Sequence, residues 1–275
     1  MCGIIGVVGT EDVGQRVFDG LKRLEYRGYD SAGIATLVGG AIVRRRAEGK
    51  LEALRQEMQA RPLSGNLGFG HTRWATHGPA IKANAHPHRG EHVAVVHNGI
   101  IENSTILKKH LINKGHVFKS QTDTEVIVHL ITENLKISKL QEAITKTLKQ
   151  LHGSFALGII FKDMPNLIVG ARRGSPLAVG YGPSENYLGS DSYALRLPDF
   201  PKGRKYAGSK IWVYYKNDSV QLHELNIGSG YLSQSAPIVF LGNKNNIEKV
   251  VVQWTDGSIN NIDMNKNINN VNSIN

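Results

Sequence analysis

A single cysteine stands at position 2 of the 275-residue sequence, directly behind the initiator methionine. Once Met1 is removed, Cys2 carries both a thiol and a free α-amino group, whose usual pKa values are about 8.5 and about 7.7–8.0. Around neutral pH the amine is partly unprotonated and can take the thiol proton, so one residue supplies a nucleophile and its base. The alternative is that Cys2 is a small apolar residue opening a buried strand, because the strand-like stretch 4–8 follows it.

Two polar segments further along the chain could serve such a nucleophile. Residues 71–78 (His-Thr-Arg-Trp-Ala-Thr-His-Gly) place a cation, an aromatic ring, two hydroxyls and two imidazoles in one loop after a predicted strand. The fork of the Arg73 guanidinium suits a carboxylate. Asn98 and Gly99 end another predicted strand, where an amide and a backbone N–H can both face one developing oxyanion. The alternative for this Asn-Gly pair is a hairpin turn.

Asp123 lies just inside a helix that is predicted to begin near Thr122. Its carboxylate either stabilises the N-terminus of that helix or binds the ammonium group of a substrate. Six histidines between residues 71 and 97 also invite a metal site. No pair of them has i, i+4 spacing on a convincing helix with a carboxylate partner, so we predict no metal centre.

Length and composition indicate an ordinary globular protein. A chain of 275 residues with 40% hydrophobic residues can bury a sizeable core and form one large domain or two small ones. One cysteine excludes an internal disulfide, and we find neither an apolar run near 18 residues nor a signal-peptide pattern, so we expect a cytoplasmic protein without a membrane segment. The net charge of +10 comes without a nucleic-acid motif. We therefore expect solvated basic faces that favour small anionic substrates, and no nucleic-acid partner.

Hydrophobic periodicity predicts the elements that must position these residues. Helices are expected at 13–27, 51–58, 104–115, 122–131 and 138–151, with Ser104 as an N-cap and Thr122/Glu125 and Ser138/Gln141 as capping boxes. Strands are expected at 4–8, 34–37, 41–46, 67–70, 93–97, 155–161, 167–169, 177–179, 211–215 and 220–225. Gly39-Gly40 predicts a hairpin turn between two of them. More strands than helices, at hairpin spacing, indicate an α/β protein with largely antiparallel sheets.

Several segments in register resemble the glutaminase domain of glucosamine-6-phosphate synthase, a class II glutamine amidotransferase also called glutamine–fructose-6-phosphate aminotransferase. The resembling segments are 1–4, 24–33, 71–78, 86–88, 97–103, 122–126, 153–156, 171–177 and 190–191. The resemblance is clear to about Leu195. It implies an N-terminal-nucleophile hydrolase fold, in which two antiparallel sheets are sandwiched between helix layers, and we expect no cofactor.

The resemblance also implies a role for each matched residue. Cys2 would attack the side-chain amide of L-glutamine and form a thioester that hydrolyses to L-glutamate, while Asn98 and Gly99 hold the oxyanion. Arg73 would bind the α-carboxylate of glutamine, and Asp123 its α-ammonium group.

Further matched residues are implied to surround or support this site. Thr76 and His77 would line the glutamine pocket, and Trp74 would belong to a mobile loop over it. Arg27 and His86 would support the site without reacting.

The resemblance predicts a glutamine amidotransferase domain over residues 1–225 and a divergent extension over 226–275. From about residue 258 the extension is asparagine-rich with single isoleucines, and we expect it to be a disordered tail because it offers no packed face. Nothing resembles the sugar isomerase domain of the family, so we expect the chain to release glutamate and free ammonia, with any ammonia acceptor in a separate partner or domain, and to form no glucosamine 6-phosphate. A trimmed domain, a natural stand-alone glutaminase and a decayed gene product all fit this ending. The alternative function is a non-catalytic or vestigial glutamine-binding domain.

Overall fold

The computed structural model describes residues 2–181, 185–191, 210–224, 247–253 and 258–263. The chain divides into two compact units, Met1–Leu195 and Arg196–Asn275. The predicted domain boundary at residue 225 differs from this division, because the hairpin of β11 (Lys210–Tyr215) and β12 (Val220–Glu224) belongs to the second unit.

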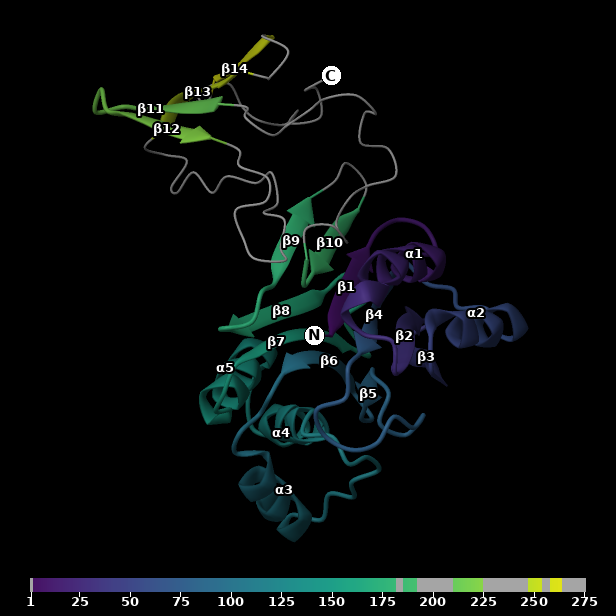
Figure 1. Cartoon of the computed structure of the whole chain (residues 1–275). Coiled ribbons are helices and arrows are strands. Elements are labelled where there is room, and N and C mark those ends of the chain that lie inside the picture. Colours follow the sequence, from purple (N-terminus) through teal and green to yellow (C-terminus); the bar gives the residue numbers. More distant parts are fainter. Residues whose placement is uncertain (1, 182–184, 192–209, 225–246, 254–257, 264–275) are drawn as a thin grey trace. The chain divides into compact units, whose positions relative to one another are not determined.

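The first unit contains a six-stranded sheet in the order β3-β2-β4-β1-β10-β9, in which every pairing is antiparallel (Figure 1). Its strands are β1 (Gly3–Val8), β2 (Ser31–Val38), β3 (Ala41–Glu48), β4 (Leu67–Arg73), β9 (Ala178–Tyr181) and β10 (Asn186–Gly189). Gly39 and Gly40 have φ values of 54° and 78°, the left-handed backbone that a two-residue hairpin turn requires. The predicted hairpin between β2 and β3 is therefore confirmed.

A second, four-stranded antiparallel sheet has the order β5-β6-β7-β8. Its strands are β5 (His88–Arg89), β6 (Val93–Gly99), β7 (Phe155–Phe161) and β8 (Ile168–Arg173). Apolar side chains of both sheets form one core cluster, in which Ile4 and Phe69 of the first sheet pack with Val96 and Ile160 of the second. The two sheets thus face each other across a buried apolar layer.

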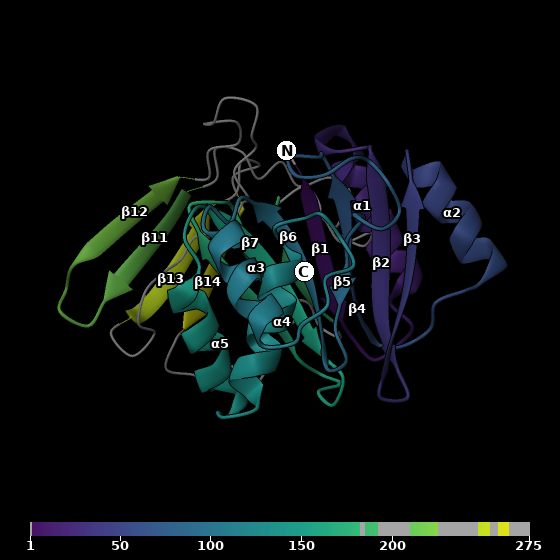
Figure 2. The same ribbon diagram turned by 90° about the horizontal axis from the view of Figure 1, so that it is seen from below.

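Helices cover the outer face of each sheet, as Figures 1 and 2 show. The helical elements of this unit are α1 (Gly14–Leu24), the 3₁₀ turn Glu25–Arg27, α2 (Leu51–Ala60), α3 (Ser104–Asn113), α4 (Glu125–Leu135) and α5 (Leu140–Gln150). α1 buries Val17, Leu21 and Leu24 against the six-stranded sheet, because these residues recur at helical spacing on one face. α4 and α5 pack against the four-stranded sheet, and α3 packs beside α4. The predicted fold, two antiparallel sheets between helix layers, is confirmed.

The predicted side-chain caps of α3, α4 and α5 are wrong. The N-cap residues are Asn103, Thr124 and Lys139, and none of them makes a side-chain cap hydrogen bond. The hydroxyl of Thr122, the predicted cap of α4, instead bonds to His88 Nε2 at 3.0 Å and to Ser120 Oγ at 3.0 Å. The Thr122 hydroxyl therefore bonds to other side chains and does not cap the N-terminus of α4, although the local sequence pattern predicts such a cap.

The second unit contains a four-stranded antiparallel sheet in the order β12-β11-β13-β14, with β13 at Ile247–Gln253 and β14 at Ile259–Asp263. The predicted disorder from residue 258 is wrong for β14, which pairs in register with β13. An edge strand is stabilised by backbone hydrogen bonds to one neighbour, so it forms without a packed face of its own. Residues 264–275 of the predicted tail lie outside the described residues.

Candidate active site

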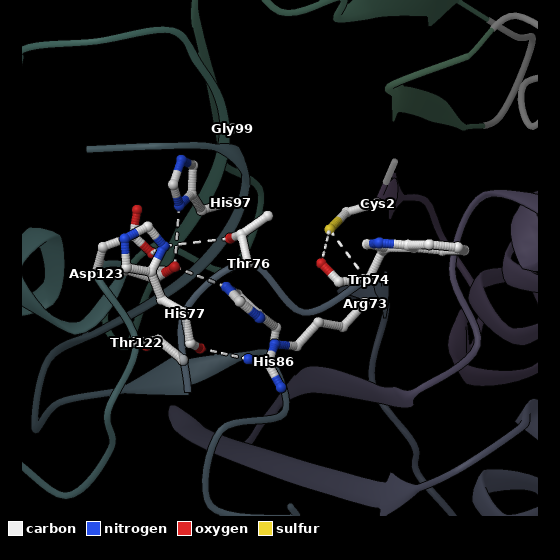
Figure 3. Close-up of a pocket in the computed structure, with 11 residues that line it drawn as sticks. Cys2, Arg73, Trp74, Thr76, His77, His86, His97, Gly99, Thr122 and Asp123 are labelled. Carbon is white, nitrogen blue, oxygen red and sulfur yellow. Dashed lines mark hydrogen bonds and ion pairs between the residues drawn. The ribbon is translucent and has the colours of Figure 1, made fainter. Parts of the chain in front are cut away.

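A pocket of the first unit collects side chains from segments that are far apart in the sequence (Figure 3). Its lining residues are Cys2, Arg73, Trp74, Thr76, His77, His86, His97, Gly99, Thr122, Asp123 and Thr124. They come from the start of β1, the end of β4 and the loop after it, the end of β6 and the turn before α4. Eight of the ten predicted site residues line this pocket. The other two, Arg27 and Asn98, contact the backbone of Cys2.

The thiol of Cys2 lies against the backbone of Trp74. Its Sγ is 3.5 Å from Trp74 O and accepts a hydrogen bond from the Trp74 N–H at 3.2 Å. Burial raises the pKa of the Cys2 thiol above its ordinary value. The thiol is therefore protonated at neutral pH, and its use as a nucleophile requires a neighbouring base.

The carbonyl oxygen of Cys2 is held from two sides. Arg27 Nε donates to it at 3.2 Å, and Asn98 Nδ2 donates to it at 3.0 Å. Arg27 is fixed in turn by an ion pair with Asp191 at 2.6 Å, in which both side chains are 7% exposed. Asp191, at the end of β10, has no role in the sequence-based prediction; the resemblance of residues 190–191 is the only signal that pointed to it. Asp191 thus fixes the position of Arg27, which in turn donates a hydrogen bond to the carbonyl oxygen of Cys2.

Asn98 and Gly99 are the last two residues of β6, where they pair with Ala156 and Phe155 of β7. The alternative that this Asn-Gly pair forms a hairpin turn is therefore wrong. Gly99 has a φ of 116°, and a Cβ added there would lie 2.1 Å from the carbonyl oxygen of Ser154. Only glycine fits this backbone, which ends the strand beside the pocket.

Arg73 is nearly buried, with 3% of its surface exposed, and its guanidinium holds the loop that follows it. Nη2 donates to the carbonyl oxygens of His77 and Gly78, and Nη1 donates to that of Pro79 at 3.1 Å. Nη1 also lies 3.7 Å from Asp30 Oδ1, an ion pair. Among the described residues, the Nε–H donates no hydrogen bond of this kind. A ligand carboxylate must therefore reach Nε or displace some of these loop carbonyls.

Asp123 lies on the far side of the pocket from Cys2 (Figure 3). Its Oδ2 accepts a hydrogen bond from the Ile101 N–H at 2.8 Å, and its Oδ1 lies 4.0 Å from His77 Nδ1. His77 Nδ1 also lies 3.3 Å from Thr76 Oγ1. One carboxylate oxygen thus holds the segment that follows β6, while the other lies toward His77 in the pocket.

Trp74 is the most exposed aromatic side chain of the pocket. The residue is 49% exposed, and its ring packs edge-on against Tyr29, with 5.6 Å between the ring centroids. A large apolar ring held at the rim in this way can cover a bound ligand.

Four histidines of this region are buried: His71, His86, His88 and His97. His86 and His97 line the pocket, and the rings of His71 and His88 lie 4.1 and 4.7 Å from the His86 ring, centroid to centroid. Burial lowers the pKa of every one of them, to about 3 for His71 and His88. His86 Nε2 and His97 Nδ1 both bond to Thr124 Oγ1, at 2.8 and 2.9 Å. The described residues contain no group of three or more His, Cys, Asp or Glu side chains that could hold a metal ion.

Two family models match the chain. Residues 71–196 match a model described as "Glutamine amidotransferase domain", and residues 201–272 match one described as "ASPIC and UnbV". The first match ends, and the second begins, close to the division between the two units at Leu195. The segment that we predicted to be a divergent extension thus has a family match of its own.

Two curated relatives that share about half of their aligned residues with this chain are both named glutamine–fructose-6-phosphate aminotransferase [isomerizing]. The glutamine–fructose-6-phosphate aminotransferase [isomerizing] of Bartonella quintana is 56% identical over 224 residues, covering 81% of this chain. The enzyme of the same name from Zymomonas mobilis is 52% identical over 226 residues, covering 82% of this chain. The chain spans 37% of the length of each of these relatives.

Solved structures share the fold at lower sequence identity. Glutamine phosphoribosylpyrophosphate amidotransferase from B. subtilis matches with a TM-score of 0.61 and 24% identity, over 97% of this chain and 50% of that one. A structure titled as the allosteric regulatory enzyme of purine biosynthesis matches with a TM-score of 0.62 and 23% identity, over the same shares. None of the described helices is long and apolar enough to cross a membrane.

Proposed function

Because the chain belongs to the class II glutamine amidotransferases, we propose that its Cys2 site hydrolyses L-glutamine to L-glutamate and ammonia. One observation carries the proposal: a pocket has the Cys2 thiol on one side and Asp123 on the other, with the Asn98 amide 3.0 Å from the Cys2 carbonyl. The pocket thus offers a nucleophile, a hydrogen-bond donor beside it, and charges of both signs for the two ends of an amino acid.

The proposed reaction begins with removal of Met1, which frees the α-amine of Cys2. This amine takes the thiol proton, and the Cys2 sulfur attacks the carboxamide carbon of glutamine. The oxyanion of the tetrahedral intermediate accepts hydrogen bonds from Asn98 Nδ2 and the Gly99 N–H. The intermediate collapses when the C–N bond breaks and the α-ammonium returns its proton to the leaving nitrogen, which departs as ammonia. Water then attacks the thioester, releasing glutamate and the thiol.

The charged ends of glutamine are held by Arg73 and Asp123 in this proposal. Arg73 binds the α-carboxylate through Nε, or through nitrogens freed when the loop carbonyls of residues 77–79 move aside. Asp123 Oδ1 binds the α-ammonium group. Thr76 and His77 line the space between them, and the exposed ring of Trp74 covers the mouth.

We further propose that the ammonia is used to aminate fructose 6-phosphate, because the curated relatives are named for that reaction. The chain spans 37% of those relatives, so the proposal assigns the sugar to a separate domain or partner. We also assign the reaction to the cytoplasm, where a single thiol stays reduced.

The test is to incubate the purified chain with L-glutamine and measure glutamate and ammonia. The wild-type chain is expected to release both in equal amounts, and Cys2→Ala neither. A wild-type chain that releases no glutamate, or a Cys2→Ala chain that releases as much as wild type, would overturn the proposal.

A further inference from the structure

His71 is a fully buried residue of β4 that reaches from one sheet of the first unit to the other. On β4 it pairs with Ile4 of β1, two residues from the nucleophile. Its Nε2 lies 2.9 Å from His97 O and 3.1 Å from Asn98 Oδ1, both at the end of β6. His71 does not line the pocket, so any effect on a bound ligand passes through these contacts.

The partners of Nε2 decide which ring nitrogen of His71 carries the hydrogen. A backbone carbonyl oxygen can only accept a hydrogen bond, so Nε2 must be the donor to His97 O. Burial lowers the pKa of His71 to about 3, so the ring is neutral and carries one N–H hydrogen. Nδ1 is then unprotonated, which agrees with its burial without a hydrogen-bond partner among the described atoms.

The N–H of His71 in turn decides the orientation of the Asn98 side chain. The oxygen and nitrogen of an amide have nearly the same shape, and a half-turn of the group exchanges them. With Oδ1 toward His71, Nδ2 points the other way and donates to Cys2 O at 3.0 Å. The reverse orientation would place the donor Nδ2 against the donor N–H of His71, and the acceptor Oδ1 against the acceptor oxygen of Cys2. Both contacts would be repulsive, so this orientation is disfavoured.

We propose that His71 is a positioning residue that keeps the Asn98 amide nitrogen directed at the oxyanion formed beside Cys2. This role rests on the proposed glutaminase function. Without His71 the Asn98 amide can also adopt the reversed orientation, in which Oδ1 presents a lone pair to the oxyanion. The loss of His71 therefore removes part of the stabilisation that Asn98 Nδ2 gives to the oxyanion. Because the ring is neutral well above its pKa of about 3, the effect should be the same across neutral and mildly acidic pH.

The first test compares two variants of similar size. His71→Leu removes the donor and is expected to lower kcat by about 10–10²-fold, below the about 10²–10³-fold that loss of a whole oxyanion donor brings. KM should change little, because His71 touches no part of the substrate. His71→Gln can place an amide N–H near the position of Nε2, so it should recover most of this loss. An unchanged kcat in His71→Leu overturns the inference.

A double-mutant cycle separates positioning from a general loosening of the fold. In an Asn98→Ala background there is no amide left to orient, so His71→Leu should lower kcat no further. Equal fold losses in the wild-type and Asn98→Ala backgrounds contradict a role that acts through Asn98.

A measurement without substrate tests the hydrogen-bond geometry by itself. Nitrogen-15 chemical shifts of the His71 ring in the wild-type chain should show hydrogen on Nε2 and none on Nδ1 from pH 6 to 8. Hydrogen on Nδ1 overturns the inference, whatever the kinetics. A wild-type chain with the expected shifts but no glutamate release would instead overturn the proposed function while leaving the assigned orientation of Asn98 supported.

Discussion

Mild acid should destabilise the first unit because its four buried histidines stay neutral when folded. The folded pKa of each lies below the ordinary value, so the unfolded chain binds more protons, and stability present above pH about 6.5 is lost as the pH falls toward 3. At pH 5.5 an unfolded histidine is about nine-tenths protonated, which corresponds to about 1.4 kcal/mol for each group with a folded pKa of about 3. His71 and His88 together therefore remove about 3 kcal/mol, and His86 and His97 act in the same direction.

Urea denaturation at pH 7.5 and 5.5 measures this loss. Hydrogen-exchange mass spectrometry on peptides of β4 and β6 restricts the readout to the first unit. His88→Gln should reduce the pH-dependent loss by about 1.4 kcal/mol, because one proton-binding site of the unfolded chain is gone. His92→Gln is the matched control, since that side chain is 48% exposed and is not one of the four buried histidines. Equal stability at the two pH values, or a His88→Gln chain with the wild-type pH dependence, would refute the reasoning.

Further substitutions test other parts of the site. Arg73→Lys and Asp123→Asn should mainly raise KM in steady-state kinetics, because both residues hold groups that are charged before the reaction begins; a loss confined to kcat would contradict this. Gly99→Ala should lower kcat by about 10²–10³-fold, as for a lost oxyanion donor, because its methyl group would stand 2.1 Å from the carbonyl oxygen of Ser154 and displace the backbone N–H. Unchanged turnover in Gly99→Ala would exclude that N–H from the oxyanion site. Arg27→Met should lower the free energy of unfolding by about 3–5 kcal/mol in urea denaturation, because it removes the buried 2.6 Å partner of the Asp191 carboxylate; an unchanged unfolding midpoint would show that the pair contributes little.

Elements with a strong periodicity of their own could be predicted from the sequence. β7 was expected at 155–161 and spans Phe155–Phe161, because a continuous apolar run between polar segments has few alternatives in a strand-rich chain. The hairpin at Gly39-Gly40 follows from two glycines that tolerate positive φ. No strand is predicted where β5, β10, β13 and β14 lie. β5, β10 and β14 span two to five residues, too few to show a strand period, and each depends on pairing with its neighbour in a sheet. β13 spans Ile247–Gln253 and lies in a segment for which the sequence analysis predicts no element.

The members of the candidate site could be predicted, but their contacts could not. The motifs pointed to Cys2, Asn98 and Arg73, and the structure brings these residues together from three separate segments. The attachment of Arg73 to the carbonyl oxygens of its own loop depends on how that loop folds back, which spacing does not specify. The contact of His71 with Asn98 joins strands of different sheets, so it appears only once the two sheets are packed.

The identity of the covalent intermediate tests the central claim most directly. The chain is mixed with glutamine, quenched in acid during turnover, and its N-terminal peptide is examined by mass spectrometry. A peptide that begins at Cys2 and carries one glutamyl group on sulfur is the predicted result. Turnover by a chain that retains Met1, or by one whose Cys2 stays unmodified while glutamate accumulates under conditions that trap the thioester, would contradict the mechanism.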